Sequence, residues 1–269
     1  MAEITAKMVN ELRAKTGQGM MECKKALQET GGDMEKAIEY FRKKGVKASL
    51  GERAASEGRV FGLATDDGKA AAIVEVNCNT DFTARSDTLA KLGGELARLL
   101  AHNANTDIAQ AAQSGLTEAS QTTGENVRLG KTARLDAPAG GKAGLYLYAI
   151  TGKIGVIMAF TGNPSEELIK QLGGHIAFAK PLGLTRDAVP ADLVAKERDF
   201  AVEQAKATGK PQQIAEKIAE GKLNAFFKEK TLLDQDFFNA AKFKGSIANY
   251  LKQNGVTLEK YVRVEVGQG

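Results

Sequence analysis

The sequence predicts an α+β fold with three parts: an N-terminal domain of three helices, a duplicated hairpin-plus-helix core with antiparallel sheets, and an inserted αα-hairpin. Apolar residues recur at helical spacing in residues 1–45. Two pairs of strands with tight turns, each pair followed by a helix, occupy residues 59–185. Residues 186–230 contain two amphipathic helices with a short break between them. A chain of 269 residues exceeds the roughly 150 that one core usually reaches, so several compact units are expected.

Composition and charge argue against some classes of function for this protein. The chain is 43% hydrophobic and 26% charged, and its 37 basic and 33 acidic residues give a net charge of +4. Dedicated nucleic-acid binders usually carry a concentrated basic face, so we expect no direct nucleic-acid partner. The sequence shows no basic-then-apolar leader and no apolar run of about 20 residues. We therefore expect a cytoplasmic protein that does not bind membranes.

Cysteine and histidine residues are too few and too widely spaced to predict a metal site. Cys23 and Cys78 have no CxxC spacing, and His102 and His175 form no HExxH motif. We interpret the two cysteines as small buried residues in a reducing compartment. His175 lies on or beside an apolar helix face, which favours a packed, hydrogen-bonded histidine. No cofactor is expected.

Residues 1–45 are predicted to form three short helices, with a break at residues 17–19. Thr5 and Asp33 are suitable N-caps for the first and third helices. The third helix carries one apolar stripe at positions i, i+3, i+4 and i+7: Met34, Ala37, Ile38 and Phe41. Residues 46–58, which are small, charged and Gly-containing, are expected to be a linker.

Residues 59–140 are expected to form the first half of the core. Residues 66–68, Asp-Asp-Gly, predict a hairpin turn between strands at 60–65 and 70–77. Ser86 can cap a helix whose leucines recur at helical spacing: Leu89, Leu92, Leu96 and Leu99. This half also contains a partly helical segment, a strand and a Pro/Gly-rich loop: residues 103–125, 127–135 and 137–144.

The second half of the core, residues 141–185 and 231–269, repeats this pattern. Its expected elements are a strand, a Gly-Lys turn, a strand, a helix and a final strand: residues 145–150, 152–153, 154–160, 164–179 and 261–266. Both helices contain Leu-Gly-Gly, at 92–94 and 172–174, which indicates an internal duplication. The glycine pair is expected to let each helix pack closely on its sheet. The final strand is placed beside the second hairpin.

Residues 186–230 then become an insertion within the second half. Pro190 can open the first helix of this hairpin, which runs to Thr208, and residues 209–211 form a tight break. The apolar positions of its two helices include Leu193, Val194, Phe200, Ala201, Ile214 and Ile218. Self-association through this hairpin, giving a homodimer, and a role as an independent arm both remain open.

Signatures of catalysis are missing from the sequence. It contains no GxxxxGK[ST], no GxGxxG after a strand and no GxSxG. Cys78 lies in an apolar strand with no nearby histidine in the sequence, whereas a reactive thiol needs an electropositive, exposed setting. The pattern favours a protein that acts by binding another protein.

Residues 75–82 are the most informative segment, because a buried strand there runs into the start of a helix. Asp81 and Phe82 follow directly. They can be presented outward, or Asp81 can cap the helix while Phe82 joins the core. Met20 and Met21 present a similar choice. Neighbouring residues lie about 100° apart on a helix, so at least one methionine must be partly exposed.

Two long motifs resemble those of a known family. Residues 12–27, LRAKTGQGMMECKKAL, and residues 75–85, EVNCNTDFTAR, resemble the two signatures of bacterial elongation factor Ts. The resemblance extends over essentially the whole chain in the same order. Thr83 stands where the family usually has Val, and Asn79 stands where Gln is common. Neither change alters the Asp-Phe pair.

The resemblance implies a guanine-nucleotide exchange factor for elongation factor Tu, acting in translation elongation, and not an enzyme. It also implies that the N-terminal domain is similar to ubiquitin-associated domains and that the inserted hairpin serves dimerisation. Some members carry a His at the turn of the second hairpin, where this chain has Thr-Gly-Lys at 151–153. Others continue into a helical tail, whereas this sequence ends at Gly269, so no tail contact is expected.

The family also implies which residues meet the partner. Phe82 would enter as a wedge between partner helices and Asp81 would anchor it, within a segment that disturbs the partner's Mg²⁺ site: Thr80, Asp81, Phe82 and Thr83. The N-terminal domain would grip the partner's nucleotide domain through four residues: Arg13, Met20, Met21 and Lys24. Phe237 and Phe238 form an apolar pair for which partner contact and core packing both remain open.

Two further classes of function are considered. One is a binding module without exchange activity, such as an RNA-associated subunit or a chaperone. The other is an enzyme that uses the Cys78 thiol, which would be sensitive to alkylation.

Overall fold

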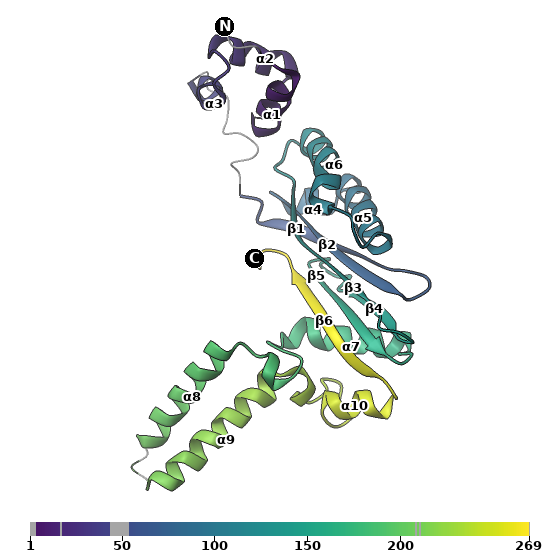
Figure 1. Cartoon of the computed structure of the whole chain (residues 1–269), viewed down its shortest axis with the longest axis vertical. Helices are drawn as coiled ribbons and strands as arrows, with labels where there is room; N and C mark the ends of the chain where they lie inside the picture. The colour runs from purple at the N-terminus through teal and green to yellow at the C-terminus, as the bar shows by residue number, and fades with distance from the viewer. Residues whose placement is uncertain (1–3, 17, 44–53, 208, 210, 269) are drawn as a thin grey trace.

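The computed structural model describes residues 4–16, 18–43, 54–207, 209 and 211–268. Three N-terminal helices lie at one end of an elongated molecule, two β-sheets lie in the middle, and a helical hairpin projects from the other end (Figure 1). The predicted α+β class with antiparallel sheets is confirmed.

The N-terminal helices enclose a small core of their own. They are α1 (Ala6–Thr16), α2 (Met20–Glu29) and α3 (Met34–Lys43). Leu12 and Leu27 are fully buried among them. The predicted caps of the first and third helices are confirmed, because the side chain of Thr5 accepts a hydrogen bond from Met8 N at 3.3 Å and that of Asp33 accepts one from Lys36 N at 3.0 Å.

Most of the predicted linker, residues 46–53, lies outside the described residues. Its last two residues already belong to the first strand. The strands are β1 (Glu57–Ala64), β2 (Ala70–Cys78), β3 (Arg128–Asp136), β4 (Lys142–Leu147), β5 (Ile154–Thr161) and β6 (Thr257–Glu265). They form two antiparallel sheets with orders β1-β2-β3 and β4-β5-β6. Both predicted hairpins are therefore confirmed, and the final strand pairs beside the second one as expected.

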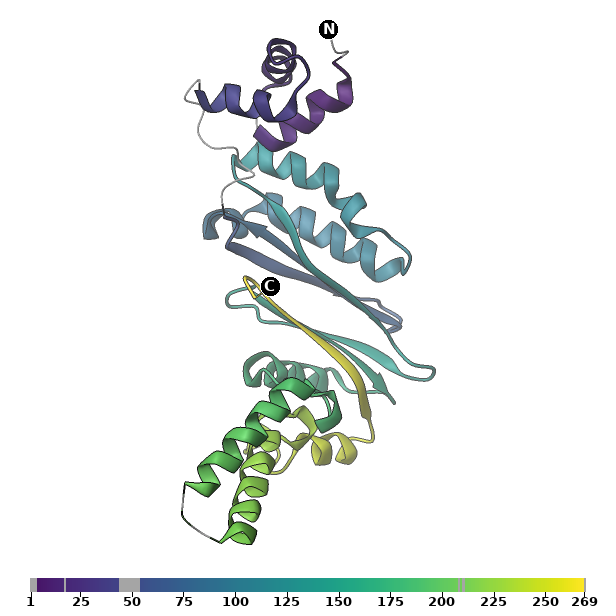
Figure 2. The same cartoon turned by 60° about the vertical axis from the view of Figure 1, so that its left-hand side comes forward.

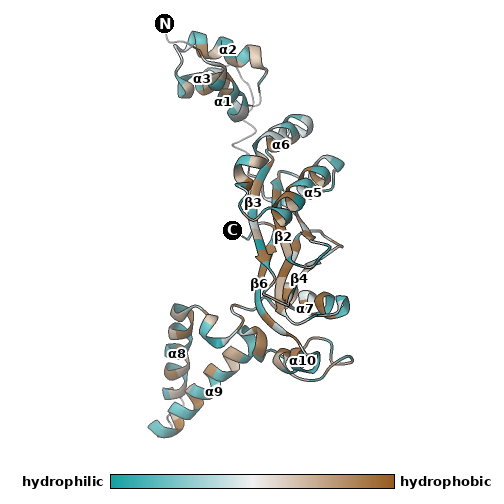
Figure 3. Ribbon diagram, turned by 45° about the vertical axis from the view of Figure 1, so that its right-hand side comes forward, coloured by the Kyte–Doolittle hydropathy of each residue, from teal (hydrophilic) through white to brown (hydrophobic). Residues whose placement is uncertain are grey.

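The two sheets stack face to face, with helices on both outer faces (Figure 2). Val60 and Ile73 from the first sheet share a core with Ile157 and Val264 from the second. The helices that complete the layers are α5 (Asp87–His102), α6 (Ile108–Thr123), α7 (Glu166–Ala179) and α10 (Ile247–Gln253). Both central strands are covered on two faces, so nearly all of their residues are buried. Figure 3 shows hydrophobic colour on strands of both sheets and on patches of the helices, with hydrophilic colour on part of β6.

Each core helix approaches its sheet through the first glycine of its Gly-Gly pair. A Cβ atom on Gly93 would lie 2.0 Å from the Phe61 ring, and one on Gly173 would lie 2.3 Å from Cβ of Tyr146. Phe61 and Tyr146 occupy the first strands of the two hairpins. The same close contact thus recurs in both halves, as the proposed duplication requires. Gly94 faces open space.

Three strands begin at least three residues earlier than predicted: β1 at Glu57, β4 at Lys142 and β6 at Thr257. Strand β4 occupies 142–147 instead of 145–150, because its first residues pair with β5 and Ala143 N donates to Gly68 O at 2.7 Å. Lys142 is then already paired with Phe160. The small residues at the start of β4 suggested a loop. In the structure Ala143 packs in the core between the two sheets, and Gly144 lies close to Ile169 of α7. Strand β6 also begins earlier than predicted, at Thr257.

The inserted hairpin consists of α8 (Ala191–Lys206) and α9 (Gln212–Lys230). The expected end at Thr208 lies outside the described residues. Four alanines form the contact between the two helices: Ala201, Ala205, Ala215 and Ala219. Several of the large apolar residues of these helices are exposed: Leu193, Phe200 and Ile214. Val202 and Ile218 are partly buried and pack against this alanine contact.

Candidate functional site

The chain leaves strand β2 at Cys78 and turns at once into a one-turn helix, α4 (Asp81–Ala84). Thr80 is the N-cap of this helix, and its Oγ1 accepts a hydrogen bond from Thr83 N at 3.3 Å. This bond satisfies one of the backbone donors that every helix start leaves free. Four residues are too few for a helix to be stable without such support.

A carboxylate from a distant part of the chain supplies further support. Glu125, just after α6, accepts hydrogen bonds from Asn79 N at 2.9 Å and Thr80 N at 3.0 Å through Oε2, and from Thr80 Oγ1 at 2.6 Å through Oε1. Partial burial raises the pKa of the Glu125 carboxyl, but hydrogen bonds from Thr80, Thr83 and Asn79 outweigh burial. The net pKa lies below the usual glutamate value, so the carboxylate is ionised at neutral pH.

Asn79 fixes the same turn from two sides. Its Oδ1 accepts a hydrogen bond from Asn126 N and its Nδ2 donates one to Ala54 O, both at 2.8 Å. The thiol of Cys78 donates to Thr80 O at 3.2 Å. The backbone before α4 is therefore held by contacts to two separate segments, residue 54 and residues 125–126.

This arrangement divides α4 into an outer and an inner side. Thr83 and Ala84 are buried against the core, whereas Asp81 is exposed and Phe82 is 84% exposed. Phe82 is thus not a core residue. Asp81 lies 3.6 Å from the Arg85 guanidinium, a pair on the solvent side of the helix. Phe82 is thus a large apolar ring presented to solvent from a backbone that hydrogen bonds hold in place, a geometry suited to contact with a partner.

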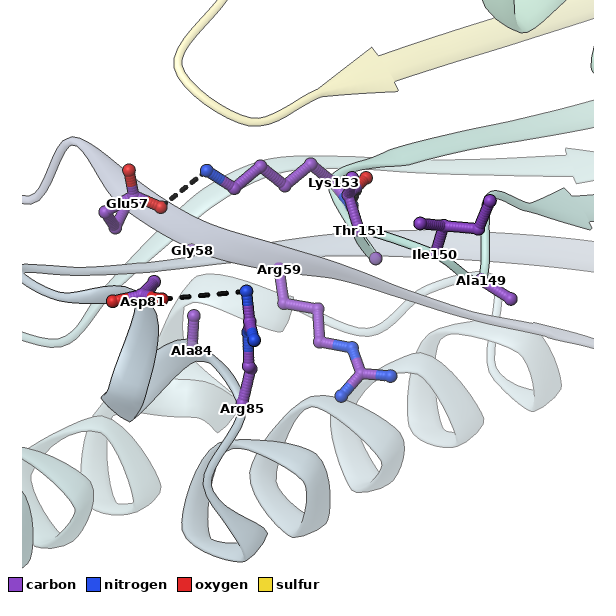
Figure 4. Close-up of a pocket in the computed structure, with 11 residues that line it drawn as sticks. Glu57, Gly58, Arg59, Asp81, Ala84, Arg85, Ala149, Ile150, Thr151 and Lys153 are labelled. Carbon is purple, nitrogen blue, oxygen red and sulfur yellow. Dashed lines mark hydrogen bonds and ion pairs between the residues drawn. The ribbon is translucent and has the colours of Figure 1, made fainter.

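A pocket of about 570 Å³ lies beside α4. Asp81 and Arg85 line it on one side, and the turn of the second hairpin, residues 149–153, lines it on the other (Figure 4). Lys153 Nζ and Glu57 Oε2 form an ion pair at 2.6 Å across its edge. The pocket therefore combines charges of both signs with apolar groups and lies between the two halves of the core.

Ile150, at that turn, is exposed and was not singled out from the sequence. An isoleucine in a turn that otherwise reads Ala-Thr-Gly-Lys is the signal that could have drawn attention to it. Glu125 was missed as well, since it lies 45 residues from Thr80 in a polar segment. Only the fold brings these residues to α4.

The four N-terminal candidates lie in a separate unit of the molecule (Figure 1). Met20 and Met21 are both exposed at the start of α2, which agrees with the argument that they cannot share one core. Lys24 is exposed on the same helix, and Arg13 near the end of α1 is partly buried. The structure does not bring these residues together with Asp81 and Phe82.

Phe237 and Phe238 have different environments. Phe237 is 4% exposed and stacks on Tyr250 with ring centroids 4.3 Å apart, so it belongs to the core of the second half. Phe238 is 59% exposed. Of the pair, Phe238 is the side chain available to a partner.

The other reactive groups named from the sequence are buried. Burial raises the pKa of the Cys78 thiol to about 11, which leaves it protonated and unreactive at neutral pH. His175 is buried, and its ring nitrogens contact Gln235 Oε1 at 2.8 Å and Phe238 N at 3.3 Å, as expected for a packed, hydrogen-bonded histidine.

Within the described residues, no group of three or more His, Cys, Asp or Glu side chains is arranged to hold a metal ion. Among the described helices, none has both the length and the apolar character of a membrane span.

Comparison with known proteins identifies the family. The family model described as Elongation factor TS matches residues 79–268. The Elongation factor Ts of Methylococcus capsulatus is 41% identical over 278 residues, covering 99% of this chain and 93% of that protein. Those of Azoarcus sp. and Thiobacillus denitrificans are 42% and 41% identical, each covering 100% of this chain and 92% and 94% of their own lengths. This chain belongs to the elongation factor Ts family and is a translation elongation factor.

Proposed function

We propose that this protein is a guanine-nucleotide exchange factor that acts in the cytoplasm and releases GDP from elongation factor Tu. The segment from Thr80 to Thr83 would disturb the Mg²⁺ and phosphate site of the partner, with Phe82 as the inserted wedge and Asp81 as its anchor. The observation that carries the proposal is the exposed ring of Phe82 on a backbone fixed by hydrogen bonds. No bond is made or broken by this chain.

The physical basis is differential binding. A GTPase holds GDP through a phosphate loop and a Mg²⁺ ion, which carries the largest local positive charge. A factor that binds the nucleotide-free partner more tightly than the GDP-loaded partner weakens GDP binding, and GDP weakens the factor's binding by the same ratio. GTP entry then releases the factor.

Phe82 suits the role of a wedge. An aromatic side chain offers a large rigid surface and loses little conformational entropy when it is buried. Thr83 and Ala84 would act from the inner side by anchoring α4 to the core. Force applied to the ring would then be transmitted to the whole sheet.

Other surfaces would hold the partner while the wedge acts. Met20, Met21 and Lys24 are exposed on α2 and, with Arg13, would contact the nucleotide domain. Phe238 would contribute a further apolar contact, with Phe237 packed beneath it at a ring-centroid distance of 5.1 Å. The exposed apolar residues of the α8–α9 hairpin are compatible with a homodimer.

The test is the rate at which a fluorescent GDP analogue leaves elongation factor Tu. Loss of an aromatic hot spot typically costs about 2 kcal/mol or more, so Phe82→Ala should slow catalysed release roughly 30-fold. Its melting temperature should stay close to that of the wild type, because the removed ring is 84% exposed. Phe178→Ala, which removes another exposed ring near the end of α7, is the matched control and should retain full activity.

Two outcomes would contradict the proposal. If the wild-type chain bound elongation factor Tu without changing the GDP release rate, it would be a passive binding module. If Phe82→Ala exchanged GDP as fast as the wild type, another group would be the wedge.

A further inference from the structure

The carboxylate of Glu125 is the only group named above that holds α4 from outside its own segment through three bonds at once. The donors of these three bonds belong to Asn79 and Thr80, the two residues immediately before the helix, at 2.9, 3.0 and 2.6 Å. The side chain of Thr83, inside α4, is a further donor to the same carboxylate. Hydrogen bonds to an ionised acceptor are shorter and stronger than those between neutral groups. A surface glutamate would normally be free to move, but this one is engaged at both oxygens.

These bonds connect to Phe82 through a continuous chain of contacts. Thr80 Oγ1 donates its hydrogen to Glu125, which directs an oxygen lone pair toward Thr83 N at 3.3 Å. That second bond caps α4. Phe82 lies between the cap residue and its bonded partner, so the direction of its Cα–Cβ bond is set by this network.

Glu125 itself is held in place on both sides. Gly124 before it ends α6 in a left-handed conformation with φ of 68°, a geometry that glycine adopts without strain. Asn126 after it donates its backbone N–H to Asn79 Oδ1 at 2.8 Å. The 124–126 segment therefore docks on the turn before α4 as a preformed unit.

We propose that Glu125 is a positioning residue for nucleotide exchange: it orients the Phe82 ring before the partner arrives and does not itself touch the partner. This role rests on the exchange function proposed above. A ring that is already oriented loses less freedom when it enters the partner. Without Glu125, two backbone N–H groups and a hydroxyl lose their acceptor, and α4 loses its support.

The first experiment measures GDP release from elongation factor Tu with single and double variants. Glu125→Ala should slow release roughly tenfold, in keeping with the sensitivity of reactions to small misplacements. In the Phe82→Ala background, the same change should have almost no further effect, because Glu125 acts through the ring. An equal slowing in both backgrounds would overturn the proposal.

Two variants control for simple loss of structure. Glu125→Gln keeps an oxygen that can accept both N–H groups and an amide that can donate to the Thr80 hydroxyl, so it should restore most of the rate. Glu118→Ala, which removes an exposed carboxylate from α6, should release GDP at the same rate as the wild type. If Glu125→Gln were as slow as Glu125→Ala while remaining folded, the hydrogen-bond network would not be the cause.

The second experiment requires no partner. The chain contains no tryptophan, so Phe82→Trp introduces a single tryptophan at the proposed wedge, which can be excited apart from the tyrosines. Its time-resolved anisotropy should show mainly whole-molecule tumbling when Glu125 is present, and a large fast component when Glu125→Ala is added. If the fast component of the anisotropy is the same with and without Glu125→Ala, the positioning role of Glu125 is wrong, but the proposed exchange function is not affected. If the wild type does not release GDP from elongation factor Tu, the proposed function is wrong, and the role of Glu125 in exchange is wrong with it.

Discussion

Three phenylalanines show that the local backbone conformation, and not the residue type, determines whether a side chain is buried or exposed. Phe237 is buried and the adjacent Phe238 is exposed, although the sequence offers no reason to separate them. The exposure of Phe82 likewise follows from the capping of α4 at Thr80. The family motif predicted the Asp-Phe pair as a contact, but the pattern of apolar residues left its burial open. Glu125 could not be predicted, because its partners are remote in sequence.

The buried His175 should make stability depend on pH. Burial lowers its pKa, and the hydrogen bond to Gln235 only partly offsets this effect. The folded state therefore favours the neutral ring, whereas the unfolded chain binds a proton near pH 6.5. Below that value the unfolded state holds more protons, so the free energy of unfolding should fall as pH falls.

Urea unfolding of the wild type and of His175→Gln at pH 7.5 and 5.5 measures this effect. The variant should be less stable at pH 7.5, because it loses a packed ring, but its stability should change less between the two pH values. The same pH dependence in both proteins would mean that other groups are responsible.

At the scale of elements, helix starts were predicted well because their causes are local. The predicted caps Thr5, Asp33 and Ser86 each accept a side-chain hydrogen bond from the backbone N–H three residues later, at 3.0–3.3 Å. The predicted first residue of strand β4 was wrong, because the contacts that determine where this strand begins come from other parts of the sequence. Ala143 and Gly144 look like loop residues, but they are buried in the strand by neighbours from other segments.

The Gly-Gly pairs allow a sharp comparison between neighbouring positions on one helix. Gly93→Ala would place a methyl group 2.0 Å from the Phe61 ring, so helix and sheet must separate, at a cost of about 1–3 kcal/mol. Gly94→Ala meets nothing within 4 Å and should gain up to about 1 kcal/mol from helix propensity. Gly173→Ala should behave like Gly93→Ala, since Tyr146 occupies the equivalent place.

Chemical denaturation of the three variants is the measurement. Equal effects at Gly93 and Gly94 would contradict the close approach of α5 to its sheet, and a harmless Gly173→Ala would contradict the structural equivalence of the two halves.

At the scale of the whole molecule, α4 and the turn of the second hairpin are joined through two sheets that share one core. Val60 N donates to Gly152 O at 2.8 Å and Ala143 N donates to Gly68 O at 2.7 Å, so backbone bonds join the two halves at both ends of their stacked sheets. The sequence predicted the duplication but not the stacking. A strand that is apolar on both faces, such as β2 or β5, gives no sign of which face meets a helix and which meets another sheet.

The shared core between the sheets should make both halves unfold together. Ile157 is fully buried on the inner face of β5, in the same cluster as Ile73 of β2. Ile157→Ala should lower the free energy of unfolding by about 2–5 kcal/mol. Because one cluster supports both sheets, hydrogen-exchange protection should fall by the same amount in peptides from β2 and from β5, whereas peptides from the projecting α8–α9 hairpin should change little.

Ile218→Ala, in the separate core of that hairpin, is the matched control and should leave both sheets protected. Loss of protection in β5 with full protection retained in β2 would show that the halves open independently, and a wedge on one half could then not draw leverage from the other.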